Sequence, residues 1–211
     1  MYKKIFNKYD KKLIAELPVV SFPGRIIVIL TPGETERAVR YLLSVGQNMK
    51  PQPLGIDTET RPSFKRGHQN MVSLLQVATP DTCFLFRLHH TGFTPALKAF
   101  LEDTTVEKVG LSLTDDMNSL HRLGEFNPGR FTDLQKMVKE VGIEDMSLQK
   151  LYANLFGQKI SKRQQLSNWD ADILSDKQKM YAATDAWTCI NIYEELTRLI
   201  QTRKYELVCI E

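Results

Sequence analysis

The chain has 211 residues, of which 42% are hydrophobic and 25% are charged, so it can bury one sizeable core but has little length for a second domain. Its three cysteines, Cys83, Cys189 and Cys209, show neither a disulfide framework nor metal-ligand spacing, which excludes a disulfide-stabilised secreted module and favours a reducing, cytoplasmic compartment. The apolar run at residues 26–30 is too short to cross a bilayer and no signal-peptide core precedes it, so no membrane partner is expected, while a net charge of +3 is too modest to prove nucleic-acid binding.

Residues 1–16 are polar and basic, and we expect an N-terminal basic arm or mobile terminus at residues 1–24 beside a single domain at residues 25–211. The first half of that domain shows short apolar runs bounded by turn residues, which mainly predict strands. The expected elements are a strand at 25–30, a helix at 34–47, a strand at 54–59, and strands at 72–78 and 83–88 that form a hairpin.

From Pro95 onward helical periodicity dominates, interrupted by a short buried strand at 109–113, with Thr114 as the expected N-cap of the following helix. The expected helices lie at 95–101, 116–123, 134–141, 148–156 and 176–203. This succession of strands and helices predicts an α/β fold with a mixed five-stranded sheet flanked by helices.

Asp57 and Glu59 stand two positions apart at the end of the buried strand 54–59. Residues at i and i+2 of a strand face the same way, so the two carboxylates repel each other and lose hydration unless a hard divalent cation lies between them. An Asp-x-Glu triplet also occurs at exposed strand ends, where both groups are simply solvated. The pair is therefore a candidate metal site that needs support from elsewhere in the chain.

Two further acidic elements follow. Tyr181 and Asp185 lie one turn apart on one face of the last predicted helix, although a core tyrosine beside a solvated aspartate has the same pattern. Asp115 and Asp116 fall in the first turn of a predicted helix, where the helix dipole favours negative charge whatever its function.

Taken in order, Asp57-x-Glu59, Asp116 and Tyr181-x-x-x-Asp185 resemble the three motifs of the DEDD superfamily of 3′–5′ exonucleases, in the DEDDy subgroup that has tyrosine in the third motif. The likeness is closest to RNase D and Werner-type exonuclease domains, and it implies a ribonuclease H-like fold and a stand-alone catalytic domain.

The resemblance covers about residues 25 to 200, and the second motif requires a choice of register. Aligning Lys108-Val109 with the strand of the family selects Asp116, whereas a shift of one residue would select Asp115.

The resemblance also implies a two-metal reaction with Mg²⁺ or Mn²⁺, because two ions about 3.5–4 Å apart can clamp the attacking, scissile and leaving oxygens of a phosphodiester. Asp57 would bridge both ions, Glu59 and Asp185 would hold the ion that activates water, and Asp116 would hold the second. Tyr181 would orient the water, because a free phenol has a pKa of about 10 and stays protonated at neutral pH.

The expected function is removal of nucleoside monophosphates from the 3′ end of DNA, either single-stranded or recessed. The alternatives are an RNase D-like exoribonuclease and a weakly active nucleic-acid-binding module, and no motif identifies a protein partner.

Two basic stretches flank the predicted metal site, and each is compatible with phosphate binding or with an ordinary solvated loop. The first follows the Asp-x-Glu motif and contains Arg61, Lys65, Arg66 and His68. The second precedes the tyrosine motif and contains Lys162 and Arg163, followed by Trp169. Lys162 matches a lysine of the relatives, whereas Trp169 is expected either to stack on a base or to pack in the core. Werner-type domains place a tryptophan after the first motif, where this chain has Arg61-Pro62.

Overall fold

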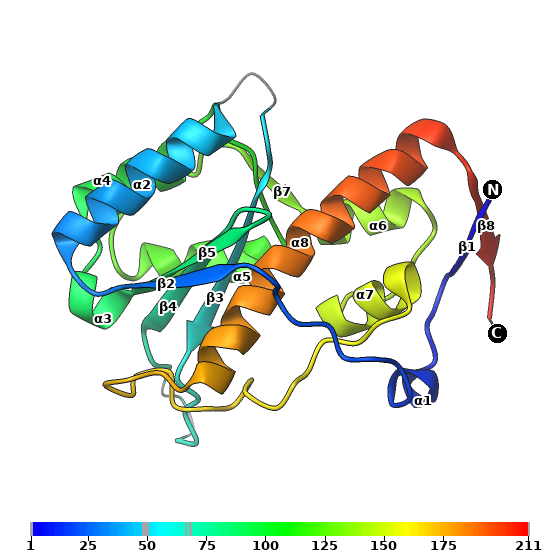
Figure 1. Cartoon of the computed structure of the whole chain (residues 1–211), viewed down its shortest axis with the longest axis horizontal. Coiled ribbons are helices and arrows are strands. Elements are labelled where there is room, and N and C mark those ends of the chain that lie inside the picture. The colour runs from blue at the N-terminus through cyan, green and yellow to red at the C-terminus, as the bar shows by residue number, and fades with distance from the viewer. Residues whose placement is uncertain (1, 48–50, 66, 68, 211) are drawn as a thin grey trace.

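The computed structural model describes residues 2–47, 51–65, 67 and 69–210 of the chain. Its main sheet has six strands in the spatial order β2-β5-β4-β3-β6-β7 (Figure 1). β4 is antiparallel to both of its neighbours, and the other three pairings are parallel. The strands are β2 (Arg25–Ile29), β3 (Leu54–Thr60), β4 (Val72–Ala78), β5 (Thr82–Arg87), β6 (Lys108–Gly110) and β7 (Phe131–Asp133).

The predicted α/β fold with a mixed sheet is confirmed, but the sheet has one strand more than the five expected. The additional strand, β7, has three residues, all of them half-buried, so no apolar run marks it in the sequence. The other predicted elements agree with the observed bounds to within two residues, except at the junction between β6 and the next helix.

At that junction the prediction was wrong, because the strand ends at Gly110 and helix α5 (Leu113–His121) begins where the strand was expected to continue. Thr114 is therefore inside the helix and is not its N-cap. The carboxylate of Asp133 in β7 accepts hydrogen bonds from the backbone N–H groups of Ser112 (3.2 Å) and Leu113 (2.9 Å). A side chain distant in sequence thus binds the first N–H groups of α5, and no local pattern could reveal it.

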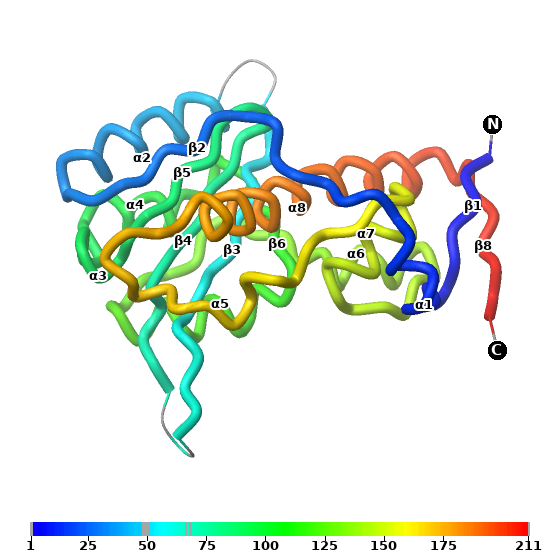
Figure 2. The backbone as a smooth tube through the Cα atoms, turned by 60° about the horizontal axis from the view of Figure 1, so that its bottom comes forward, coloured from blue at the N-terminus to red at the C-terminus, as the bar shows by residue number. Residues whose placement is uncertain are grey.

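Helices cover both faces of the sheet (Figures 1 and 2). α8 crosses one face diagonally with α6 and α7 beside it, and α2, α4 and α5 pack against the other face. The helices of the first face are α6 (Leu134–Glu140), α7 (Leu148–Phe156) and α8 (Asp176–Thr202). Those of the second face are α2 (Pro32–Gly46), α4 (Pro95–Glu102) and α5, and the short α3 (Leu88–Thr91) follows β5.

The central strand β4 is buried on both sides because its residues alternate between two hydrophobic cores. Leu75 and Val77 belong to the core beneath α2 and α4, and Leu74 and Ala78 belong to the core beneath α8. This continuous burial explains why β4 appears in the sequence as a mostly apolar run with two polar residues, Ser73 and Gln76.

Helix α8 approaches β3 closely at Gly55. A Cβ atom on Gly55 would overlap the carbonyl oxygen of Ala186 in α8, so only glycine fits at this contact. Because Ala186 directly follows Asp185, the contact places an acidic residue of the helix beside the end of the strand that carries Asp57.

The N-terminal segment belongs to the folded body. β1 (Lys3–Phe6) pairs in parallel with β8 (Tyr205–Val208), and the short α1 (Lys11–Ile14) follows. The side chain of Ile5 is fully buried in the core beneath α8, and Asn154 of α7 bonds both backbone groups of Phe6, at 2.9 and 2.7 Å. The segment is therefore not simply a mobile terminus, and the domain boundary at residue 24 stays a prediction.

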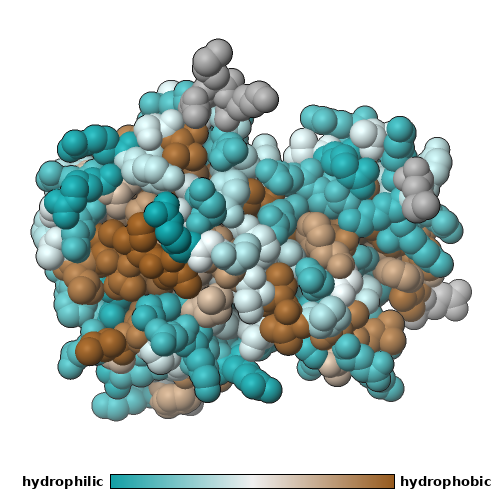
Figure 3. Space-filling model, viewed as in Figure 1, coloured by the Kyte–Doolittle hydropathy of each residue, from teal (hydrophilic) through white to brown (hydrophobic). Residues whose placement is uncertain are grey.

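Apolar side chains gather on the surface at the β2 edge of the sheet, next to α2 (Figure 3). Ile27, Leu30 and Tyr41 are each more than one third exposed there. In the part of the chain that the structure describes, no helix combines the length and the apolar character needed to cross a membrane.

Candidate active site

Three carboxylates converge where the end of β3 meets the first turns of α8. Asp57 and Glu59 face the same side of β3 because they are two positions apart, and Asp185 reaches them from the helix. Each of the three offers an oxygen atom that lies within 4.8 Å of the others, which is close enough for a shared cation. The structure therefore brings together the first and third predicted motifs, which are more than 100 residues apart in sequence.

Asp116 approaches the cluster from α5, on the other side of β3. The hydroxyl of Thr58 donates a 2.5 Å hydrogen bond to Asp116 Oδ1, which ties the aspartate to the strand between Asp57 and Glu59. Asp116 is half-buried and its charge raises the pKa of Asp57, whereas Asp115 is exposed on the outside of the helix. This placement favours Asp116 over Asp115 as the second-motif residue.

The pKa values of all four carboxyl groups are raised, first of all by burial. For Asp57 the neighbouring charges of Asp116, Glu59 and Asp185 add to burial, in that order. Burial, and then repulsion by the negative charge of Asp185, raises the pKa of Glu59 to about 9. Without a cation, the cluster therefore keeps protons at pH values where exposed carboxyl groups are ionised.

Burial also raises the pKa of Asp116 to about 6 and that of Asp185 to about 7. The Thr58 hydroxyl opposes the shift at Asp116, and the Tyr181 hydroxyl and the charge of Lys162 oppose the shift at Asp185.

The donor set fits a hard divalent cation. Oδ1 of Asp185 is buried and has no hydrogen-bond partner among the described residues, so it is free to bind an ion. All the converging ligand atoms are carboxylate oxygens, the type that Mg²⁺ and Mn²⁺ prefer. Burial raises the pKa of the nearby Cys189 thiol, and among the described residues its sulfur is not one of the converging ligand atoms.

Tyr181 lies one turn before Asp185 and lines the same cavity, of about 260 Å³, as the three converging carboxylates. Burial and then the charge of Asp185 raise the pKa of its hydroxyl, so the phenol stays protonated and can donate a hydrogen bond but cannot act as a base. The Trp169 ring packs near the Tyr181 ring, with 5.9 Å between centroids. Trp169 is fully buried, so of its two predicted roles it has the packing role and cannot stack on a base.

The cationic residues that are predicted to contact nucleic acid do not all line the cavity that contains the carboxylates. Lys162 is exposed and lines the cavity that contains Tyr181 and the three carboxylates, which we call the catalytic cavity. Its charge lowers the pKa of Asp185. Arg163 is also exposed but lines a neighbouring cavity. Arg61 is exposed just beyond β3, where Ser73 and Asn70 bond its backbone. Lys65 is exposed in the same loop, and Arg66 and His68 lie outside the described residues.

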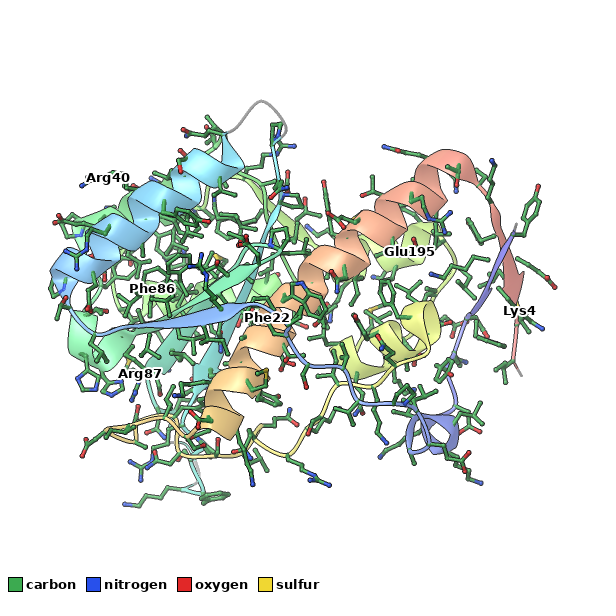
Figure 4. The ribbon with its side chains drawn as sticks, viewed as in Figure 1. Lys4, Phe22, Arg40, Phe86, Arg87 and Glu195 are labelled. Carbon is green, nitrogen blue, oxygen red and sulfur yellow. The ribbon has the colours of Figure 1, made fainter. Side chains whose placement is uncertain are left out.

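Three residues that support the site were not identified in the sequence. Thr58 binds Asp116, and Asp133 fixes the start of the helix that carries Asp116. Arg87 is buried and donates hydrogen bonds to the backbone carbonyls of Ala171 and Asp172, in the loop that leads into α8 (Figure 4). Only Arg87 had a local signal, since a charged residue at the end of an apolar strand needs a partner.

Comparison with known proteins agrees with this geometry. The profile of the family described as 3′-5′ exonuclease matches residues 31–201. The bifunctional 3′-5′ exonuclease/ATP-dependent helicase WRN of Mus musculus is 29% identical over 195 residues, which cover 88% of this chain but only 14% of that protein. A 3′-5′ exonuclease of Arabidopsis thaliana is 28% identical over 192 residues, which cover 86% of this chain and 67% of that protein.

Among solved structures, the Trypanosoma brucei RNase D complex with RNA U12 superposes with a TM-score of 0.69 at 19% identity, covering 83% of this chain and 63% of that one. At this identity the likeness establishes the fold alone. The predicted ribonuclease H-like arrangement is therefore confirmed.

Proposed function

Because the chain belongs to the 3′–5′ exonuclease family, whose members are phosphodiester hydrolases, we propose that it releases nucleoside monophosphates from the 3′ end of DNA, either single-stranded or recessed. The observation that carries the proposal is the convergence of Asp57, Glu59 and Asp185 within 4.8 Å, with Asp116 and Tyr181 beside them. We assign the chain to the DEDDy subgroup as part of the same proposal, and Tyr181 in the third motif supports this assignment.

In this proposal Asp57, Glu59, Asp116 and Asp185 hold two Mg²⁺ or Mn²⁺ ions. When bound, such ions stabilise negative charge on the attacking, scissile and leaving oxygens of the phosphodiester. Their binding also requires the carboxylates to release the protons that burial retains, so ion affinity increases with pH.

Tyr181 orients the attacking water by donating a hydrogen bond from its protonated phenol. Lys162 lines the same cavity as the carboxylates and supplies a positive charge there for a phosphate of the substrate. We assign further phosphate contacts to Arg163, which lines the neighbouring cavity, and to Arg61, which is exposed just beyond β3. These roles follow from the resemblance and agree with the positions of the side chains.

RNA is the alternative substrate. The relative whose structure is described as a complex with RNA shares the fold, and the DNA assignment follows the likeness to Werner-type exonuclease domains. Discrimination between the two depends on contacts to the 2′-hydroxyl.

A gel assay with matched 5′-labelled DNA and RNA strands, in Mg²⁺, Mn²⁺ or EDTA, tests the proposal and ranks the substrates. We expect a metal-dependent ladder that shortens from the 3′ end and is absent with Asp57→Ala. Near-normal turnover by that variant would refute the metal-site assignment. Tight strand binding without cleavage by the unmodified protein would favour the binding-module alternative.

A further inference from the structure

The outer side of β2 is an open edge of the main sheet. In the part of the chain that the structure describes, β2 pairs with β5 alone, and Figure 1 shows it at the front of the sheet. The N–H of Arg25 donates to the carbonyl of Asp81 (2.9 Å), so the backbone groups of residues 25, 27 and 29 point toward β5. Those of Ile26 and Val28 therefore point outward, where their N–H and carbonyl groups can bond another strand.

No residue of β2 protects this edge. Open edges of natural sheets usually contain a lysine, a proline or a bulge that prevents another strand from pairing. Residues 26–29 are Ile-Ile-Val-Ile, and they pair with β5 without any shift of register. The edge is closed only beyond the strand, where the N–H of Leu30 donates to the Glu34 carboxylate (2.9 Å). The outward groups of Ile26 and Val28 are therefore accessible to a further strand.

Apolar side chains border the open edge on the side of α2. Ile27 is 38% exposed and Tyr41 of α2 is 40% exposed, and both line a cavity of about 380 Å³ formed by β2, β5 and α2 (Figure 3). Leu30 is 45% exposed at the end of the strand. A strand that pairs with β2 would cover Ile27, so it would gain apolar contact in addition to main-chain hydrogen bonds.

Opposite charges lie at the two ends of the open edge. Arg25 begins β2, and the Glu34 carboxylate lies at the other end, where it accepts hydrogen bonds from the N–H groups of Leu30 and Thr31. Arg25 is exposed and Glu34 is half-buried, and neither forms an ion pair with any residue that the structure describes. In an antiparallel pair of β2 strands, Arg25 of each copy would lie next to Glu34 of the other. The edge is therefore complementary to itself, as a two-fold symmetric interface requires.

We propose that the open edge binds a second copy of this chain, through antiparallel pairing of the two β2 strands about a two-fold axis at Ile27. In this register Ile26 of each copy lies opposite Val28 of the other, and each such pair exchanges both of its N–H···O bonds. The two Ile27 side chains meet at the axis. Because opposite residues of paired strands share a face, the two α8 helices lie on the same side of the joined sheet. The proposal does not depend on the exonuclease function.

Cross-linking through single cysteines tests the register. Ile27→Cys is made in a Cys209→Ser background, because Cys209 is exposed whereas Cys83 and Cys189 are buried. Across the axis the two Cα atoms at position 27 would be about 4.5 Å apart, a separation that a disulfide spans. Leu30→Cys in the same background is the matched control, since Leu30 is similarly exposed but would lie about 20 Å from its copy along the paired strands.

We expect mild oxidation to convert Ile27→Cys into a disulfide-linked dimer at least about 10-fold faster than Leu30→Cys. Equal rates for the two variants would overturn the pairing. Because both replacements are small and lie at exposed positions, this comparison does not require a variant that disturbs the fold.

Sedimentation velocity measures the association itself. Each copy contributes one short strand to the contact, so we expect a dissociation constant of about 1–100 µM for the unmodified protein. Ile27→Lys places two like charges at the axis and should raise this constant at least about 10-fold. Leu13→Lys, at an apolar position of α1 that is 55% exposed, should change it less than about 2-fold.

Two outcomes of the sedimentation experiment would overturn the proposal. An unmodified protein that stays monomeric up to about 500 µM would exclude the second copy as the occupant and leave the edge to an extended peptide from another protein. A dimer whose dissociation constant is unchanged by Ile27→Lys would show that the copies associate through a different surface.

Discussion

Replacing Asp185 with asparagine is expected to stabilise the metal-free protein while abolishing its activity. The variant keeps the shape of the side chain but removes one negative charge from a buried cluster that has no cation to balance it. Asp185 is 6% exposed, and burial raises its pKa from 3.8 to about 7. The folded state therefore disfavours the ionised form of this group, and the unfolded state does not.

These pKa values determine the sign of the stability change and the pH range in which it occurs. Below pH 3.8 both states hold the proton and the group does not affect stability. As the pH rises toward 7, the unfolded chain releases its proton while the folded protein retains it, so stability falls. Above the folded pKa the penalty is complete, and at about 1.4 kcal/mol per pKa unit it amounts to about 4 kcal/mol. Since the other carboxylates share protons with Asp185, we expect the variant to gain about 2–4 kcal/mol at pH 8.

Thermal unfolding in EDTA at pH 8 and pH 5 measures this gain. For a chain of this size the expected increase in Tm at pH 8 is about 5–15 °C, and the free-energy gain should fall by about 2–3 kcal/mol at pH 5. Asp172→Asn, at an exposed position outside the cluster, should change stability by less than about 0.5 kcal/mol at either pH. A loss of stability at pH 8, or an equal gain at both pH values, would refute the electrostatic argument.

Three further outcomes are expected. Asp116→Ala should lower kcat at least about 100-fold and Asp115→Ala less than about 3-fold, as measured on a labelled strand in Mg²⁺; the reverse order would shift the second motif by one residue. Gly55→Ala should destabilise the protein by about 2–4 kcal/mol in urea unfolding, because its Cβ meets the carbonyl of Ala186, and an unchanged midpoint would show that α8 can move away from β3. Tyr181→Phe should lower kcat about 10–100-fold without changing the alkaline limb of the pH profile, since the phenol is protonated throughout; loss of that limb would make the phenol a base.

The long elements of this fold could be predicted from the sequence because their signals are local. Continuous apolar runs predict β3, β4 and β5, and helical periodicity predicts α7 and α8. The elements that were missed, β1, β7, β8, α1 and α3, have only three or four residues each, too few to show a period. They form because distant segments pair with them, as β8 pairs with β1.

The site shows the same division between local and distant information. Spacing alone places Asp57 with Glu59 on one face of a strand, and Tyr181 with Asp185 on one face of a helix. Spacing could not reveal that these two faces meet, because that depends on the contact between Gly55 and α8. It also left the role of Trp169 open, since burial of an aromatic ring is a property of the tertiary structure.

Because of its periodicity, helix α8 uses consecutive residues for the metal site and for its packing contacts. Successive positions of an α-helix are about 100° apart, so neighbouring residues face different partners. Asp185 faces the carboxylates of β3, Thr184 accepts a hydrogen bond from the backbone N–H of Phe22, and the Ala186 carbonyl packs on Gly55. A shift of this helix would therefore disturb the metal site, the contact with Phe22 and the contact with the sheet at once. Gly55→Ala should accordingly lower the cleavage of a labelled strand in Mg²⁺ as well as the stability, because a Cβ atom at this position displaces the helix that carries Asp185.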